Sequence, residues 1–146
     1  MSLENLLKIG QLKRHATDAA EIGRLLEAAR RNVSDANVEA ISVETRFDAA
    51  YKAIMQLALA ALMANGFRPD TNRPGHHMTV VQALPLTIGM ASDRVTVLDA
   101  LRRKRNLSDY TGEDIDEASL QQCLDEARQL LAEVPAWLRD NRPDLT

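Results

Sequence analysis

The feature that most constrains this sequence is a long apolar stripe between residues 36 and 64. Its members recur at steps of three and four residues: Phe47, Tyr51, Ile54, Ala58 and Ala61. This spacing places side chains on one face of an α-helix, which is stable only when that face is buried. Gly66 follows the stripe, and glycine commonly ends a helix because it adopts the left-handed conformation without strain. The pattern predicts a central helix over residues 36–64.

Shorter segments on both sides of this helix also have helical periodicity. We expect helices over residues 3–12, from Thr17 or Asp18 to Ala29, over His76–Leu84, from Ser92 or Asp93 to Leu107, and from Asp116 to Trp137 with a bend or restart at Pro135. Residues 32–35 and 67–75 are expected to be connections, and no strand is expected because the β-branched residues lie inside helical patterns. Short connections favour an all-α, antiparallel, up-and-down bundle of about five helices.

Composition supports one helical domain spanning residues 1–146, with a peripheral N-terminal helix within residues 1–16. Hydrophobic residues make up 45% of the chain and aromatic residues only 3%, so aliphatic side chains must fill the core. The single cysteine, Cys123, can form neither an intrachain disulfide nor a multi-cysteine zinc site. No metal and no cofactor are expected.

The charge and the apolar runs limit the partners. The formal net charge is −3, whereas a protein that neutralises many duplex phosphates is usually basic over one face. Any contact with nucleic acid must therefore be confined to a local patch. The opening residues lack the pattern of a signal peptide, and the most apolar run, residues 57–64, is too short to span a bilayer. We expect a cytoplasmic protein without membrane contact.

One helical segment, residues 98–110, contains the main chemical signal of the chain. Leu98, Leu101 and Arg105 are separated by three and four residues, so Arg105 continues an apolar face. A guanidinium directed at a packed surface is costly unless an anion or a hydrogen-bond acceptor meets it. Arg105 is therefore a candidate binding residue.

The polar neighbours of Arg105 allow two interpretations. Arg102 and Asn106 flank the same line of the helix and could contribute to a site. Cations in the last turn of a helix also complement its dipole, by about 0.3–1 kcal/mol each. We assign Arg103 and Lys104 to that structural role as solvated side chains. For Arg105 with Asn106, the pattern alone leaves a site and a helix end equally open.

Three motifs resemble the HEPN domain family (higher eukaryotes and prokaryotes nucleotide-binding). The run Arg105-Asn106-x-x-x-Tyr110 is similar to the family's Arg-Asn-x-x-x-(His or Tyr) segment. Two further stretches match the family in order and spacing: Arg46, Ala50, Tyr51 and Lys52 followed by Gly66-Phe67-Arg68-Pro69, and then Gly75-His76-His77. Each motif is weakly specific alone, and together they are moderately specific. The resemblance covers residues 36–137.

The resemblance implies a bundle that dimerises along the helix bearing the motif, so that two Arg-Asn segments form one composite cleft. Active members of the family are metal-independent RNases, others bind nucleotides or partner proteins, and many are paired with a nucleotidyltransferase in toxin–antitoxin modules. For this chain it implies a homodimer, with RNA or a nucleotide as ligand and a nucleotidyltransferase-type protein as partner. The ligand-binding residues would be Arg102, Arg105, Asn106 and Tyr110, and the last three would be catalytic in an RNase.

Tyr110 occupies the position where catalytic members have a histidine. A histidine pKa of about 6.5 suits proton transfer at neutral pH, whereas a tyrosine ordinarily ionises near about pH 10. Tyr110 is therefore better suited to hydrogen bonding or base stacking. His76 and His77 are not expected to replace the missing histidine together, because neighbours on a helix diverge by about 100° and would not both face one cleft. His15 has no supporting context.

Three functions remain open. The one slightly favoured is a HEPN-like protein that binds RNA, a nucleotide or a partner protein through a basic dimer-interface cleft without efficient catalysis. The second is a metal-independent endoribonuclease, the toxin half of a toxin–antitoxin pair. The third is a dimeric helical interaction scaffold. Elsewhere, Glu113, Asp114 and Asp116 are assigned to a helix start, where carboxylates favour the positive end of the dipole. Trp137 is assigned to one end of the bundle.

Overall fold

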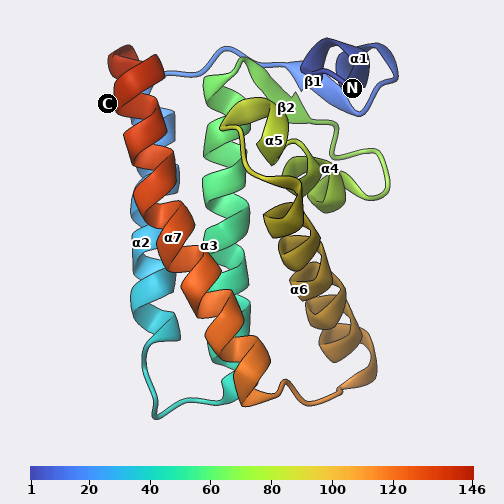
Figure 1. The fold of residues 1–146 in the computed structure, drawn as a ribbon, viewed down its shortest axis with the longest axis vertical. Coiled ribbons are helices and arrows are strands. Elements are labelled where there is room, and N and C mark those ends of the chain that lie inside the picture. The colour runs from blue at the N-terminus through green and yellow to red at the C-terminus, as the bar shows by residue number, and fades with distance from the viewer.

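Four long helices connected at alternate ends make up most of the structure, which is a computed structural model describing residues 1–146 (Figure 1). They are α2 (Ala19–Ala36), α3 (Val43–Ala64), α6 (Ser92–Thr111) and α7 (Glu117–Asn141). The short elements are α1 (Leu3–Lys8), β1 (Leu12–Arg14), β2 (Phe67–Pro69), α4 (His76–Gln82), α5 (Leu84–Thr87) and the 3₁₀-helix η1 (Pro143–Leu145). The prediction of an all-α bundle is confirmed, with seven α-helices instead of about five.

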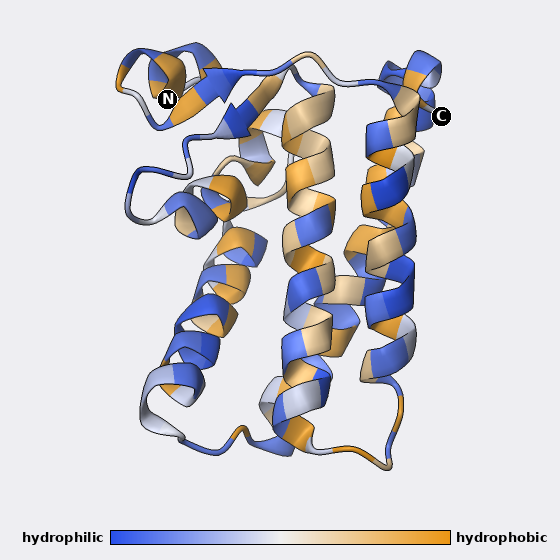
Figure 2. Ribbon diagram, turned by 180° about the vertical axis from the view of Figure 1, so that it is seen from behind, coloured by the Kyte–Doolittle hydropathy of each residue, from blue (hydrophilic) through white to orange (hydrophobic).

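The central helix α3 packs between α2 and α7, and the predicted stripe is its buried face. Phe47, Tyr51 and Ile54 are all but inaccessible to solvent. Small residues let the neighbouring helices approach closely: Ala50, Ala53, Ala58, Ala60 and Ala61 are fully buried. By length and composition α3 is apolar enough to cross a membrane, but 61% of its most apolar window is buried inside the bundle. Its apolar surface is used within the fold, and Figure 2 shows that α6 is more hydrophilic than α3.

Several helix boundaries differ from the predicted ones. The segment over residues 32–35 belongs to the end of α2, because Val33 and Ala36 continue its buried face. Helix α3 therefore begins at Val43, where the Ser42 hydroxyl accepts a hydrogen bond from the backbone N–H of Thr45. Helix α2 continues through residues 32–35, whose polar sequence predicted a connection, because side chains in and beside this segment are buried.

The other long helices also continue further than expected. Helix α6 extends to Thr111 and ends at Gly112, whose φ of 72° is the left-handed conformation that glycine adopts easily. Helix α7 continues through Pro135 to Asn141, because Val134 and Leu138 on either side are fully buried and hold it in place. Trp137 is partly buried against the core.

A small two-stranded sheet shows that the expectation of no strand was wrong. Strands β1 and β2 pair antiparallel, with Leu12 opposite Pro69, Lys13 opposite Arg68 and Arg14 opposite Phe67. The helix expected over residues 3–12 ends at Lys8, β1 begins at Leu12, and β2 occupies the start of the connection expected over residues 67–75. Three residues are too few for an alternating pattern to be recognised, and each strand is stabilised by a partner more than fifty positions away.

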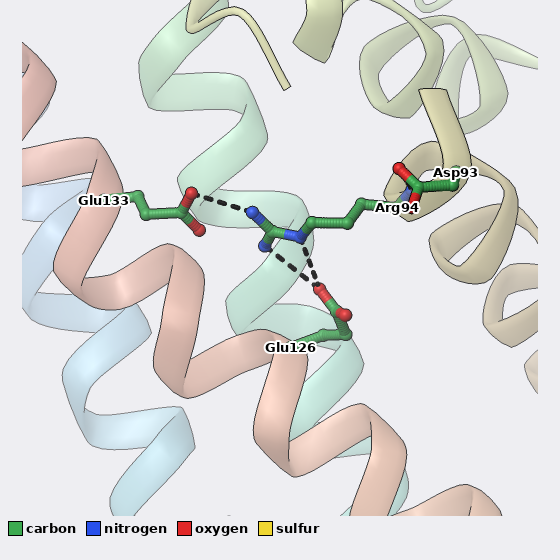
Figure 3. Close-up of polar contacts among 4 residues, drawn as sticks. All are labelled: Asp93, Arg94, Glu126 and Glu133. Carbon is green, nitrogen blue, oxygen red and sulfur yellow. Dashed lines mark hydrogen bonds and ion pairs between the residues drawn. The ribbon is translucent and has the colours of Figure 1, made fainter. Parts of the chain in front are cut away.

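An ion-pair cluster joins α6 to α7 (Figure 3). Arg94 Nη1 lies 2.7 Å from a carboxylate oxygen of Glu133, and its Nε and Nη2 lie 3.3 and 3.1 Å from Oε2 of Glu126. The other oxygen of Glu133 is buried without a hydrogen-bond partner. One guanidinium therefore pairs with two carboxylates in a partly desolvated place, and these three groups keep one net negative charge.

Candidate functional site

A cavity of about 500 Å³ lies where α3, α4, α6 and the end of β2 meet. We call it the Arg105 cavity. Its lining combines apolar residues (Met55, Leu59, Pro69, Val80), charged or titratable residues (Asp48, Lys52, His76, His77, Arg105) and other polar residues (Tyr51, Gln56, Thr71). Small-molecule sites in proteins have this size and this mixture of apolar surface with a few converging polar groups.

Arg105 meets two carboxylates and an aromatic ring of its own chain. Its Nε lies 3.9 Å from Asp48 Oδ1, and its Nη2 lies 3.5 Å from Asp109 Oδ2. The guanidinium also lies over the ring of Tyr51, 5.2 Å from the centroid. Both N–O distances exceed the roughly 2.7–2.9 Å of a strong charge-assisted hydrogen bond. The side chain is 31% exposed, so its charge is partly compensated and its donors remain available.

Asp48 is the one carboxylate among the residues that line the cavity. Burial and the nearby carboxylate of Asp109 raise its pKa, and Arg105 opposes that effect. Lys52, Arg105 and Asp48 give the lining a net charge of +1 while its histidines are neutral, and Asp109, which pairs with Arg105 from outside the lining, offsets that charge. A phosphate or carboxylate group of a ligand would therefore pair with Arg105 by displacing one of its carboxylates.

Tyr51 forms part of the wall beneath Arg105. Its ring is buried, and its hydroxyl has no hydrogen-bond partner. Burial raises the pKa of Tyr51 to about 12, against the opposing effect of Arg105 and Arg102. The hydroxyl is therefore neutral at physiological pH and able to donate or accept a hydrogen bond.

Both His76 and His77 line the cavity, which corrects the expectation that they could not face one cleft. They lie in the first turn of α4, where His76 is half-buried and His77 is exposed, and a divergence of about 100° still leaves each beside the cavity. Their rings are in edge contact, with centroids 4.6 Å apart. Burial, His76 and Arg105 lower the pKa of His77, which is therefore neutral at pH 7.

The other predicted site residues lie outside this cavity. Arg102 donates from Nε to Asp99 at 3.0 Å, and Arg103 contacts the other oxygen of that carboxylate at 2.7 Å. Asn106 is half-buried, and Tyr110 is 87% exposed. Residues five apart on a helix diverge by about 140°, so a single chain does not bring Tyr110 to Arg105.

The end of α6 and the start of α7 bear on the predictions made for Lys104 and Asp116. Lys104 is not simply solvated, because its amine donates to Asp116 at 3.1 Å and to the hydroxyl of Ser119 at 2.6 Å. Asp116 caps α7 as expected, accepting from the backbone N–H of Ser119. These hydrogen bonds hold the pKa of Asp116 well below its usual range.

Sequence reasoning missed Asp48 and Asp109 as partners of Arg105. A usable signal was present on α3, because Asp48, Met55 and Leu59 recur at helical spacing along one edge of the predicted helix, next to Lys52. No group of three or more His, Cys, Asp or Glu side chains is placed as a metal site would require.

Comparisons with known proteins assign no family. No model of a known protein family matches the chain, and a search of curated proteins finds no similar sequence. The chemistry of the Arg105 cavity is therefore the main structural indication of function.

Proposed function

We propose that this protein binds a nucleotide, or the end of an RNA chain, in the Arg105 cavity, as a HEPN-like protein without efficient catalysis. Arg105 and Lys52 supply positive charge for a phosphate. Met55, Leu59 and Val80 supply an apolar wall against which a base can pack. The resemblance to the HEPN motifs supports the same ligand class.

The observation that carries this proposal is the unpartnered hydroxyl of Tyr51. A buried polar group without a hydrogen bond costs about 1–3 kcal/mol, and native structures contain few such groups. Tyr51 lines the cavity and Arg105 lies over its ring, so a phosphate that draws the guanidinium towards itself would change the surroundings of Tyr51. A ligand oxygen that reached the hydroxyl would satisfy it.

Replacing Tyr51 by phenylalanine is expected to stabilise the protein and weaken binding. The free energy of unfolding should rise by about 1 kcal/mol, because a desolvated hydroxyl is removed. The affinity for AMP or UMP should fall by about fivefold, the equivalent of one hydrogen bond. Urea unfolding and titration calorimetry measure the two effects. Thr146→Val, which removes an exposed hydroxyl far from the cavity, should alter neither. Unchanged AMP affinity in Tyr51→Phe would remove the hydroxyl from the proposed site.

A metal-independent endoribonuclease is the second candidate, favoured by the two histidines beside Arg105. Neutral His77 would take the proton of the ribose 2′-hydroxyl, whose oxygen attacks the phosphorus. His76 would give a proton to the departing 5′-oxygen, while Arg105 stabilises the negative charge of the transition state. The products would be a 2′,3′-cyclic phosphate and a 5′-hydroxyl. Tyr110 is not needed in this scheme.

Incubation of a labelled single-stranded RNA with the protein and a chelator tests the second candidate. Cleavage should generate a 2′,3′-cyclic phosphate and fall at least about 100-fold in His77→Gln, because general-base catalysis contributes that much. Since the pKa of His77 is lowered, its neutral form persists below the usual histidine range, and activity should extend to mildly acidic pH. His15→Gln is the control. If the wild-type protein does not cleave the RNA, the endoribonuclease is excluded and binding without catalysis is the function that remains.

A second copy along α6 is part of the proposal. Leu107 is 50% exposed near the end of that helix, close to Tyr110, so apolar surface is available there. The second copy would add its own Asn106 and Tyr110 near the site, as the resemblance implies. The resemblance also suggests a nucleotidyltransferase-type protein as a further partner. Sedimentation equilibrium should give twice the chain mass; a monomer would remove the composite cleft. A protein that dimerises but binds neither nucleotide nor RNA would be an interaction scaffold.

A further inference from the structure

The N-terminal lobe, defined here as residues 1–15 with residues 66–75, concentrates positive charge in an acidic protein. It contains five basic side chains and two carboxylates: Lys8, Lys13, Arg14, Arg68 and Arg73, with Glu4 and Asp70. Five minus two gives the lobe +3, and since the whole chain is −3, the remaining residues carry −6. Figure 1 shows the lobe at one end of the bundle, with β1 and β2 side by side.

The centre of this charge is a pair of like-charged residues on the more exposed face of the sheet, where Lys13 is exposed and Arg68 is half-buried. Lys13 and Arg68 are opposite each other in the antiparallel pair, so their side chains share one face, whereas Leu12 and Phe67 are buried on the other. Directly opposed like charges are destabilising in a sheet. Asp70, 4.0 Å from Lys13, is the only carboxylate within ion-pair distance of either residue. The carboxylates of the chain therefore neutralise only part of the positive charge on this face.

This face lies next to the Arg105 cavity, on the other side of the ribbon. Pro69, the last residue of β2, lines the cavity, and so does Thr71 in the segment that follows. Arg68 immediately precedes Pro69, and successive side chains of a strand point to opposite faces, so Arg68 projects from the face of the ribbon opposite the one that lines the cavity. A chain of phosphates that leaves the cavity past residues 69–71 would pass the edge of β2 to reach Arg68 and Lys13.

We propose that the exposed face of the β1–β2 sheet, through Lys13 and Arg68, binds the phosphate backbone of a single-stranded RNA whose end lies in the Arg105 cavity. The inference rests on the proposed function and adds an RNA path to it. A polyphosphate backbone is the ligand chemistry that relieves opposed cations along a short ribbon. The acidic remainder of the surface would keep RNA off the rest of the bundle.

The test compares a long and a short ligand against two double variants. The ligands are a fluorescein-labelled ten-nucleotide single-stranded RNA and AMP. In Lys13→Gln/Arg68→Gln, the dissociation constant for the RNA should rise by about tenfold and the slope of log affinity against log salt should fall by about 1.4, or 0.7 for each lost phosphate contact. AMP affinity should not change. Arg30→Gln/Arg139→Gln, on neighbouring residues of the α2–α7 side, removes the same charge and should affect neither ligand.

Each outcome decides the proposal. Equal RNA affinity in the two double variants overturns it, whether both stay at the wild-type value or both weaken through general charge. Poly-glutamate that competes as well as RNA assigns the face to an acidic protein and also overturns it. An unchanged thermal melting temperature verifies that each variant is folded. Lys13→Glu should weaken RNA binding more than Lys13→Gln does. If AMP does not bind and Arg105→Ala does not change RNA affinity, the proposed function of the cavity fails. If RNA affinity still falls only in Lys13→Gln/Arg68→Gln, the sheet remains an RNA-binding surface.

Discussion

Replacing Arg94 by methionine is expected to lower the free energy of unfolding by about 2–3 kcal/mol. Methionine retains much of the packing volume but leaves Glu126 and Glu133 without their shared cation. The side chain of Glu126 is only 14% exposed, so water cannot replace the guanidinium well. We place the loss below the full cost of breaking a buried pair because Glu133 is more exposed.

Urea unfolding of matched variants isolates this effect. Arg30→Met removes an exposed cation that lies 2.7 Å from Glu27 in the same helix, and should cost less than about 1 kcal/mol. Adding Glu126→Gln and Glu133→Gln to Arg94→Met should recover most of the loss, because no unpaired charge then remains. A loss in Arg94→Met no larger than that in Arg30→Met would show that the cluster contributes little to the contact between α6 and α7.

Replacing Arg105 by alanine is expected to weaken AMP binding by about 10- to 100-fold, because a charged hydrogen bond contributes about 1.5–3 kcal/mol. The fold should tolerate the change. The partner carboxylates, Asp48 and Asp109, are 54% and 42% exposed, so water can solvate them once the guanidinium is gone. Binding and stability therefore separate in this variant.

Arg103→Ala is the matched control for Arg105→Ala. Arg103 lies on the same helix and has the same charge, but its side chain is 71% exposed and contacts Asp99 outside the cavity. Its loss should leave AMP affinity within about twofold, since distant surface charges are screened. Arg105→Lys should bind between the two, because it keeps the charge and loses the planar fork. Equal affinities in all three variants would remove Arg105 from the site.

The long helices could be predicted because their signals are local. The stripe from Phe47 to Ala61 needs only the helical period to identify a buried face, and the structure buries it. Boundaries were less predictable: α2 continues through residues 32–35 because α3 and α7 offer surfaces that bury Val33 and Ala36. A polar segment becomes helical there through packing that is not encoded within the segment.

The site was predictable only in part. The position of Arg105 on an apolar line showed that something had to compensate its charge, but Asp48 lies on a different helix, 57 positions earlier in the chain. The two histidines were excluded by an angle that holds along a helix but does not decide which residues border an opening at the helix start. Asn106 and Tyr110, the other motif residues, lie outside the cavity of the single chain.

The sequence by itself determined the helical class, the buried face of α3 and the unusual placement of one guanidinium, because periodicity and burial cost act over a few residues. Tertiary structure alone decided that residues 12–14 and 67–69 form a ribbon, that its cations gather at one end of an acidic chain, and that Tyr51 and two histidines share a cavity with Arg105. These features depend on contacts between distant segments, whose loop-closure cost is met only when the whole core forms.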